Sequence, residues 1–284
     1  MAPSVPDSQN SMTASRFWRD HFRASRARAL VLALPDSSDL SPAERAAIEK
    51  SIRQFQRGEA GEGRRVLRRG LAYWRATGDR YFIRALRLFI AEENRHSAYL
   101  LHFMQRHGIA PVRKHWVDSV FRVLRGLAGL ELSLRMLVTA EIIAVPYYRA
   151  LREATRSPLL RAICRRILQD EAAHLRYQAS MLDRIGSGRG RSASWAVARL
   201  HRIFLTGTLI VVWIEHGAVF RAAGYTLARF ACEAHEEFRV FARESAPDTS
   251  LRKAAAQRCR WAESRSRRER APERSKDCSA RRRR

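Results

Sequence analysis

Cysteine is scarce in this sequence of 284 residues, and none of its four cysteines belongs to a Cys-x-x-Cys pair. Paired cysteines are typical of zinc sites, and many closely spaced cysteines are typical of small secreted proteins held together by disulfides. The sequence predicts neither. We expect a reducing compartment, the cytoplasm, where free thiols persist. The four cysteines are Cys164, Cys232, Cys259 and Cys278.

Long apolar runs are also missing. The longest candidate, Ile203–Ile214, covers 12 residues before Glu215 and His216 interrupt it, whereas a membrane-spanning helix needs about 20. We therefore expect a buried fifth helix there; contact with a membrane surface or another subunit is the alternative. Near the N-terminus, Ala29–Leu34 is apolar but no small-residue cleavage pattern follows, so a secretion signal is not expected.

Lysine is rare, because only 4 of the 54 basic residues are lysines and the other 50 are arginines. The net charge is +26, and clustered cations attract nucleic acids and anionic lipids. The concentrated source is the segment 251–284, with 14 basic and 4 acidic residues. Contact with nucleic acid or membrane through this tail is an alternative that we do not favour, since an arginine-rich genome composition would produce the same skew.

Alternating apolar and polar residues, the pattern of a strand, are missing between residues 41 and 245. The apolar residues there recur every three or four positions, which is typical of helices. We therefore expect an all-α fold. Ser41, Pro42 and Glu44 supply an N-cap, a first-turn proline and a capping-box acid, so a long helix is predicted to begin there.

Turn and cap signals divide the chain into long helices. Gly78 and Asp79 separate the first from the second, and Ser157 with Pro158 begins the fourth. Pro146 is expected to bend the third helix. The six predicted helices cover about residues 41–77, 79–107, 118–155, 157–185, 194–222 and 226–245.

These helices define four regions of the chain. Residues 1–40 are a leader, partly disordered, in which we expect the amphipathic stretch Phe17–Phe22 to dock on the folded part. Residues 41–185 form the main bundle, and residues 194–245 add two accessory helices. Residues 246–284 form an arginine-rich tail with too few apolar residues to fold, so we expect disorder there.

Acidic and imidazole side chains interrupt the buried faces of the second and fourth predicted helices. Residues spaced alternately four and three apart share one face of a helix. On the buried face of the second helix they are Phe82, Leu86, Phe89, Glu93, His96, Leu100 and Phe103. The fourth has Leu160, Cys164, Ile167, Glu171, His174, Gln178 and Met181. Two Glu-x-x-His motifs therefore lie at the centre of faces that are otherwise apolar.

The other two long helices each place an acid in the same seam. The first has Glu59, with Glu62 beside it, and the third has Glu141. Several carboxylates in one core need protons, cationic partners or metal ions to compensate their charge. The Glu-x-x-His spacing puts both groups on one helix face, so two such motifs predict two ions, with Glu59 and Glu141 completing each site or bridging between them. Abundant oxygen with one imidazole per ion suits iron or manganese better than zinc.

The order Glu, Glu-x-x-His, Glu, Glu-x-x-His across residues 41–185 resembles the ferritin-like superfamily, in particular its rubrerythrin and bacterioferritin branch. The resemblance implies a ferritin-like four-helix bundle, here followed by two additional C-terminal helices. It also implies a dimetal site. The metal ligands would be Glu59, Glu93, His96, Glu141, Glu171 and His174.

The resemblance also implies a type of chemistry. Two iron ions, or manganese as the alternative, would be the cofactor of an oxidoreductase of the hydroxylase, desaturase or peroxidase type. Its partners would be dioxygen or peroxide, an organic substrate that the sequence does not define, and an external electron donor, because the paired cysteines of a rubredoxin module are missing. Iron sequestration with ferroxidase activity is one alternative, and a non-enzymatic helical protein that binds polyanions or membrane is another. Association into homo-oligomers is left open.

Several neighbours of the predicted ligands are candidates for supporting roles. For Glu62 we favour an exposed or supporting carboxylate, with a role as alternate ligand to Glu59 as the other possibility. Glu92 and Asp170 precede the two motif glutamates, and we expect each to hold the histidine of the opposite helix by its second ring nitrogen. Three tyrosines fall near the site by spacing, with core packing as the favoured role: Tyr99, Tyr148 and Tyr177. The two halves match as an internal duplication, Glu92-Glu93-x-x-His96-x-x-Tyr99 against Asp170-Glu171-x-x-His174-x-x-Tyr177.

Overall fold

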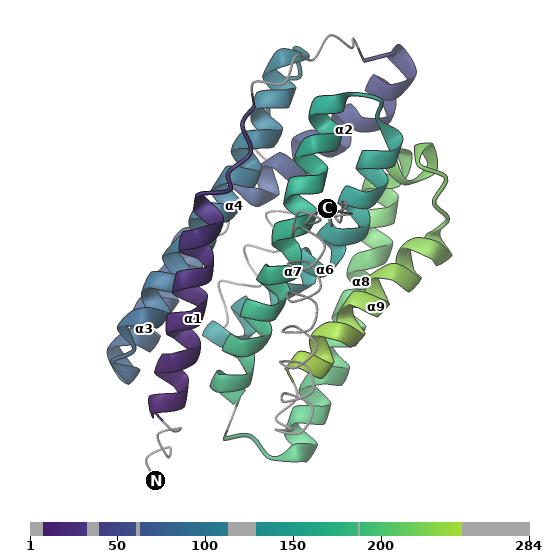
Figure 1. Ribbon diagram of the computed structural model, residues 1–284. Coiled ribbons are helices and arrows are strands. Elements are labelled where there is room, and N and C mark those ends of the chain that lie inside the picture. Colours follow the sequence, from purple (N-terminus) through teal and green to yellow (C-terminus); the bar gives the residue numbers. More distant parts are fainter. Residues whose placement is uncertain (1–7, 33–39, 61–62, 113–128, 187, 246–284) are drawn as a thin grey trace, which may run out of the picture. The chain divides into compact units, whose positions relative to one another are not determined.

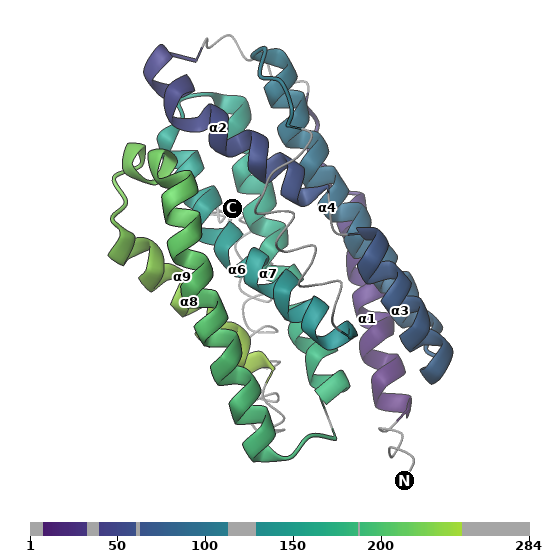
Figure 2. The ribbon, with the colours of Figure 1, turned by 180° about the vertical axis from the view of Figure 1, so that it is seen from behind.

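The computed structural model describes residues 8–32, 40–60, 63–112, 129–186 and 188–245, and these contain eight α-helices and no strand (Figure 1, Figure 2). The all-α prediction is confirmed for this part of the chain. The helices are α1 (Ser8–Arg26), α2 (Pro42–Glu59), α3 (Gly63–Thr77), α4 (Arg80–Arg106), α6 (Leu130–Ala154), α7 (Pro158–Gly186), α8 (Arg191–Ala222) and α9 (Leu227–Glu244). The predicted tail, 246–284, and residues 1–7 and 33–39 of the predicted leader lie outside the described residues.

Local capping chemistry sets where several helices begin. Ser41 Oγ accepts a hydrogen bond from the backbone N–H of Glu44, and the Glu44 carboxylate accepts one from the N–H of Ser41, so the predicted capping box of α2 is confirmed. Asp79 caps α4, because its Oδ1 accepts from the N–H groups of Tyr81 and Phe82. Such caps satisfy donors that the first helical turn leaves unpaired.

The first predicted helix, 41–77, is divided into α2 and α3, so the prediction of one continuous helix was wrong. Glycines occupy positions 58, 61 and 63, and glycine disfavours a helix interior by about 1 kcal/mol relative to alanine. Gly63 also lies against α4, since a Cβ there would be 2.4 Å from Ile90 Cγ2. Glu59 is consequently the last residue of α2 rather than a mid-helix residue.

The remaining helices follow the predicted ranges closely. α4, α7, α8 and α9 begin and end within three residues of the expected positions. α6 is described from Leu130, so the predicted helix start near Asp118 lies outside the described residues. Pro146 lies inside α6.

Four helices close a ring around one core. α2 packs on α4, α4 on α7, α7 on α6 and α6 on α2. These are the four helices that carry the predicted ligands. α8 and α9 pack on α6, while α1 and α3 pack on α4, so they add helices on two different sides of the ring (Figure 1).

The predicted leader contributes α1, which packs along α4 and also contacts α7. Trp18 and Phe22 are buried, whereas Phe17 is 60% exposed. Ser15 Oγ donates to Asp79 Oδ2 at 2.7 Å, and Ser25 Oγ donates to Glu92 Oε1 at 2.6 Å. Because residue 15 pairs with the start of α4 and residue 25 with its middle, α1 and α4 run in the same direction.

α8 is the one described helix whose composition and length, over Ser192–Ala222, would allow it to cross a membrane. The short apolar run considered in the sequence did not reveal this, because scattered polar residues interrupt the run while charges remain few. A core helix of a soluble protein meets the same test. Leu205, Leu209, Val219 and Phe220 are buried, whereas Ile203, Ile210 and Ile214 are exposed.

Candidate metal centre

The predicted ligands gather in the core of the four-helix ring. Glu93 and His96 come from α4, Glu171 and His174 from α7, and all four are buried. One ligand atom from each of these residues lies within 4.8 Å of the others. This buried group could hold a metal ion.

The two motif glutamates lie between the two histidines. Glu93 Oε1 is 3.8 Å from His96 Nδ1 and 2.8 Å from His174 Nδ1. Glu171 has Oε1 at 3.7 Å from His96 Nδ1 and Oε2 at 3.7 Å from His174 Nδ1. Each carboxylate therefore faces both imidazoles.

The lone glutamates lie on opposite sides of this group. Glu59 Oε2 is 3.9 Å from His96 Nδ1, and Glu141 Oε2 is 3.7 Å from His174 Nδ1. The cluster thus has two halves, and each half combines one histidine with one glutamate from a neighbouring helix. Glu62, the alternate to Glu59, lies outside the described residues.

Four buried atoms at the centre have no hydrogen-bond partner among the described residues. They are Glu93 Oε1, His96 Nδ1, Glu171 Oε2 and His174 Nδ1. A buried polar atom without a partner costs about 1–3 kcal/mol, and more for charged groups. Because all four can donate an electron pair and face one another, a bound cation would satisfy them together. The residues present therefore fit a metal ion.

The second nitrogen of each histidine contacts an acid from the opposite helix. His96 Nε2 lies 3.2 Å from Asp170 Oδ2, and His174 Nε2 lies 3.2 Å from Glu92 Oε2. With Nε2–H donating to these carboxylates, Nδ1 of each imidazole is the nitrogen that faces the cluster and that a cation would bind. These are the crossed contacts that the sequence predicted for Glu92 and Asp170.

The two outer acids are themselves held by hydrogen bonds. Glu92 accepts from Ser25 and Arg95, and Asp170 accepts from Arg166, whose guanidinium also donates to Ser25 Oγ at 3.0 Å. Burial opposes ionisation of Glu92, but hydrogen bonds from His174 and Ser25 lower its pKa to about 2. Glu92 is therefore ionised at neutral pH. Sequence reasoning missed Ser25, and the only signal for Arg166 was its i, i+4 spacing to Asp170.

The pKa values of the four glutamates inside the cluster are shifted in different directions. Burial and the charge of Glu141 raise the pKa of Glu93 and of Glu171 well above the ordinary value, and burial raises that of Glu59. The pKa of Glu141 is lowered despite its burial, because the neighbouring Glu171 carboxyl and His174 imidazole favour its ionised form. In the metal-free protein, protons therefore compensate charge that a cation would otherwise neutralise.

Two polar side chains support the lone glutamates. Tyr148 donates from its hydroxyl to Glu59 Oε1, and Gln178 Nε2 donates to Glu141 Oε1 at 2.9 Å. Of the three predicted tyrosines, only Tyr148 contacts a candidate ligand by a hydrogen bond among the described residues. Tyr99 accepts from the Leu30 N–H, and Tyr177 packs against aromatic rings of α1 and α4.

Glu131, the other acid of α6, belongs to a different part of the molecule. It forms ion pairs with Arg135 and Arg189 and has no contact with the cluster among the described residues. It lies ten residues, almost three helical turns, before Glu141 on α6 and has a structural role in these ion pairs.

A small recess leads to the cluster at the break between α2 and α3. Its cavity volume is about 10 Å³, roughly the space for one water molecule. Glu59 and Glu93 contribute to its lining, so both carboxylates face a space of water size. The other lining residues are Gly63, Val66, Phe89, Ile90, Asn94 and Leu137.

No protein-family model and no curated protein matches the chain. What the buried cluster does chemically therefore has to follow from its own geometry.

Replacing Asp170 by Asn is expected to weaken metal binding about 10–100-fold, because an amide holds the His96 imidazole less firmly than a carboxylate does. Titration with Fe(II) or Mn(II) under anaerobic conditions measures the affinity. Asp20→Asn is the matched control, because Asp20 is exposed and pairs only with Arg19 in the described structure. An Asp170→Asn affinity equal to that of the control would show that the contact does not orient a ligand.

Proposed function

We propose that the chain is a ferritin-like dimetal protein of the cytoplasm that binds two iron ions, with manganese as the alternative, and reduces dioxygen or peroxide. The observation that carries the proposal is the division of the cluster into two halves. One half pairs His96 with Glu59, the other pairs His174 with Glu141, and Glu93 and Glu171 face both. Carboxylate-bridged dimetal bundles use such a set of ligands.

The donor set supports iron or manganese over zinc, since it offers many carboxylate oxygens and only two imidazoles. Bound iron would supply the one-electron and oxygen chemistry that amino-acid side chains lack. The crossed contacts to Glu92 and Asp170 fix the imidazoles, and Tyr148 and Gln178 fix the lone glutamates. The chain's own residues therefore orient the ligands and exclude bulk water from the core.

Proton handling is the second task of the protein residues. In the metal-free protein the raised pKa values of Glu93 and Glu171 let these carboxyls hold protons, which bound metal ions would displace. Tyr148 holds a further proton, because burial and the nearby charge of Glu59 raise its pKa well above the ordinary value. Reduction of dioxygen or peroxide to water consumes protons, so groups that keep them beside the cluster favour this reaction.

The size of the recess beside Glu59 and Glu93 limits what can reach the cluster by this route. The space of about 10 Å³ beside Glu59 and Glu93 has room for about one water molecule and none for an organic molecule. Among the hydroxylase, desaturase and peroxidase types, we therefore favour the peroxidase type with electrons from an external donor. Iron oxidation for sequestration is the second candidate, because a metal ion is also small enough for this route.

The decisive experiment is metal analysis of protein reconstituted with Fe(II) and, separately, with Mn(II). We expect about two ions per chain, lost in Glu93→Ala and in Glu171→Ala. Glu131→Ala is the matched control, since Glu131 is a partly buried acid that contacts only arginines. Wild-type protein that retains no first-row metal after reconstitution would refute the proposal.

Reaction with peroxide separates the two candidates. Reduced, metal-loaded protein is expected to consume peroxide repeatedly while a donor is supplied, and to keep about two ions per chain. Accumulation of many irons per chain in a large oligomer would instead establish sequestration.

A further inference from the structure

Two rows of arginines run side by side on α1 and α4, away from the metal cluster. On α1 they are Arg16, Arg19, Arg23 and Arg26, at spacings of three, four and three that keep them on one side of the helix. On α4 they are Arg80, Arg84 and Arg87. Because the two helices run in the same direction and are in contact, the rows lie next to each other.

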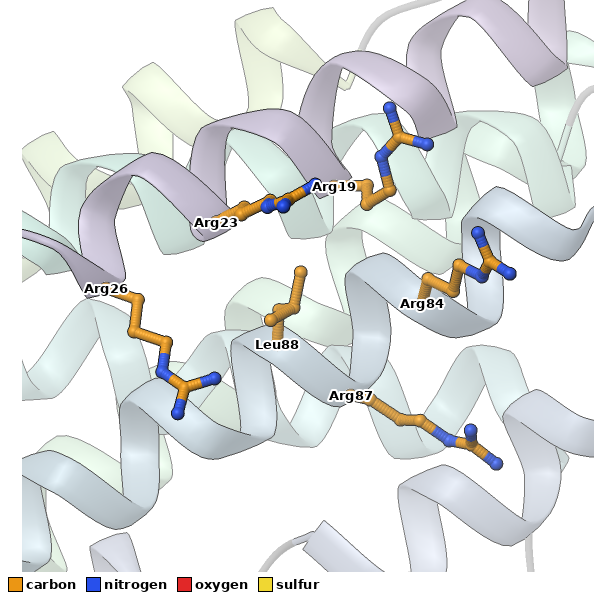
Figure 3. A pocket seen from close by; sticks show the side chains of 6 residues that line it. All are labelled: Arg19, Arg23, Arg26, Arg84, Arg87 and Leu88. Carbon is orange, nitrogen blue, oxygen red and sulfur yellow. The ribbon is translucent and has the colours of Figure 1, made fainter.

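Five of these arginines line a groove between the helices, together with Leu88 (Figure 3). Three belong to α1 and two to α4, and Leu88 projects between the helices in the figure. The groove has a volume of about 340 Å³, enough for a small charged group such as a chain of phosphates. The five arginines are Arg19, Arg23, Arg26, Arg84 and Arg87.

Most of this charge has no counterpart in the described structure. Arg19 pairs with Asp20 and lies over the Tyr81 ring. No carboxylate of the described residues forms an ion pair with the other four arginines of the groove. By contrast, arginines elsewhere on the ring of helices, such as Arg149 and Arg166, contact acids directly.

The packing of α1 on α4 keeps these like charges together. Ser15 bonds to Asp79, Ser25 bonds to Glu92, and the Phe22 ring lies 5.9 Å from the Phe89 ring. These contacts, made by the neighbouring side of α1, hold the two rows of arginines together against their mutual repulsion. An anion in the groove would relieve that repulsion without any movement of the helices.

The type of cation indicates the type of anion. A guanidinium presents planar, paired donors that match two oxygens of one phosphate, and it keeps its charge at any physiological pH. Along a helix the charges recur about every 5 Å, so several adjacent phosphates can be contacted at once. The groove offers Leu88 as its apolar residue and no aromatic ring in its lining, which suits contact with phosphates rather than with bases.

We propose that this arginine groove is a binding site for a ligand that carries several adjacent phosphate groups. Such groups occur in small polyphosphorylated molecules and in the backbone of a nucleic-acid strand, and the groove recognises the chemistry that both share. The site is separate from the metal cluster and does not depend on the proposed function. It also differs from the C-terminal tail, because it belongs to the folded part of the chain.

The test measures binding of inorganic tripolyphosphate and of a short single-stranded oligonucleotide to the full chain. Two groove variants, Arg84→Ser/Arg87→Ser on α4 and Arg23→Ser/Arg26→Ser on α1, are each expected to weaken binding about tenfold or more at low salt. Arg161→Ser/Arg165→Ser on α7 is the matched control, since both residues are exposed and the change in net charge is the same. Circular dichroism and urea unfolding verify that each variant keeps its fold.

The outcomes separate the sources of the ligand. Binding of tripolyphosphate alone, lost in the groove variants, assigns the site to a small phosphorylated molecule. Binding of the oligonucleotide alone assigns it to a nucleic acid, and the slope of log affinity against log salt should fall by about 0.7 for each phosphate contact removed. Equal losses in the groove and control variants, or binding only to anionic lipid vesicles, would overturn the proposal.

Discussion

Metal loading is expected to raise the free energy of unfolding by about 4 kcal/mol when free Fe(II) or Mn(II) exceeds its dissociation constant a thousandfold. The physical reason is that the metal ions bind the folded core and not the unfolded chain, and that they replace hydrogen bonds missing among its six acidic and imidazole groups. The increase in the free energy of unfolding should arise at the four atoms without a hydrogen-bond partner, which belong to Glu93, His96, Glu171 and His174. Urea unfolding of chelator-treated and reloaded protein measures it, and identical midpoints would contradict a metal site in this core.

The pH dependence of the metal-free protein provides a separate check of the same prediction. The folded-state pKa of Glu171 is raised above its ordinary value of 4.5 by burial and by Glu141. Its contribution to stability is therefore fully present below pH 4.5 and is lost as the pH rises through the raised pKa. Glu171→Gln, which does not titrate, should lose less stability than wild type over this range.

Glu131 is a control for the pH dependence, because its pKa is shifted in the opposite direction to that of Glu171. A hydrogen bond from Arg189 lowers the pKa of Glu131, although partial burial opposes the shift. Its contribution is therefore present above pH 4.5 and is lost as the pH falls. Glu131→Gln should accordingly change stability at neutral pH but leave the decline at higher pH as it is in wild type. A decline of equal size in Glu171→Gln and wild type would show that Glu171 is not the group that titrates.

The second large effect is expected at Phe22. Truncation to Ala should lower the free energy of unfolding by about 3–5 kcal/mol, because a fully buried ring is lost and a cavity remains. The ring lies 5.0 Å from that of Tyr177 and 5.9 Å from those of Phe89 and His174. α1 should then separate from α4 and unfold more often, so that trypsin cleaves after its arginines faster.

Phe17 is the matched control on the same helix. It is 60% exposed, so Phe17→Ala should change stability by no more than about 0.5 kcal/mol. Urea unfolding and the rate of tryptic cleavage within α1 are the measurements. Equal effects of the two substitutions would show that α1 is not anchored through Phe22.

The seam of the bundle could be predicted because helical spacing alone decides which side chains share a face. Glu93, His96, Glu171 and His174 recur in step with apolar neighbours, and the structure brings all four together. The crossed contacts of Glu92 and Asp170 with the histidines could also be predicted from the sequence. Each of these acids precedes a motif glutamate by one position and therefore turns towards the neighbouring helix. The resemblance to ferritin-like proteins stays a prediction.

Other parts of the site could not be predicted because they lack a periodic signal. Ser25 is a single small polar residue in a stretch interpreted as a leader, and only the packing of α1 brings it to Glu92. The apolar spacing continues past residue 59, so it predicted one helix across the break before Gly63. The glycines there were the one local sign against a continuous helix. The rows of arginines on α1 and α4 could not be recognised in the sequence, because arginine is common along the whole chain.

The order in which the chain is made gives the α1 contacts a further consequence. Ser25 and Arg166, which share a hydrogen bond, are 141 residues apart, and Ser25 and Glu92 are 67 apart. During synthesis the N-terminal residues leave the ribosome first, so α1 is complete long before Arg166 exists. The contacts of Asp170 with His96 and Arg166, and that of Glu92 with His174, can therefore form only after α7 has emerged. A chain that stops before that helix lacks Glu171, His174 and Arg166, so this core can be completed only late in synthesis.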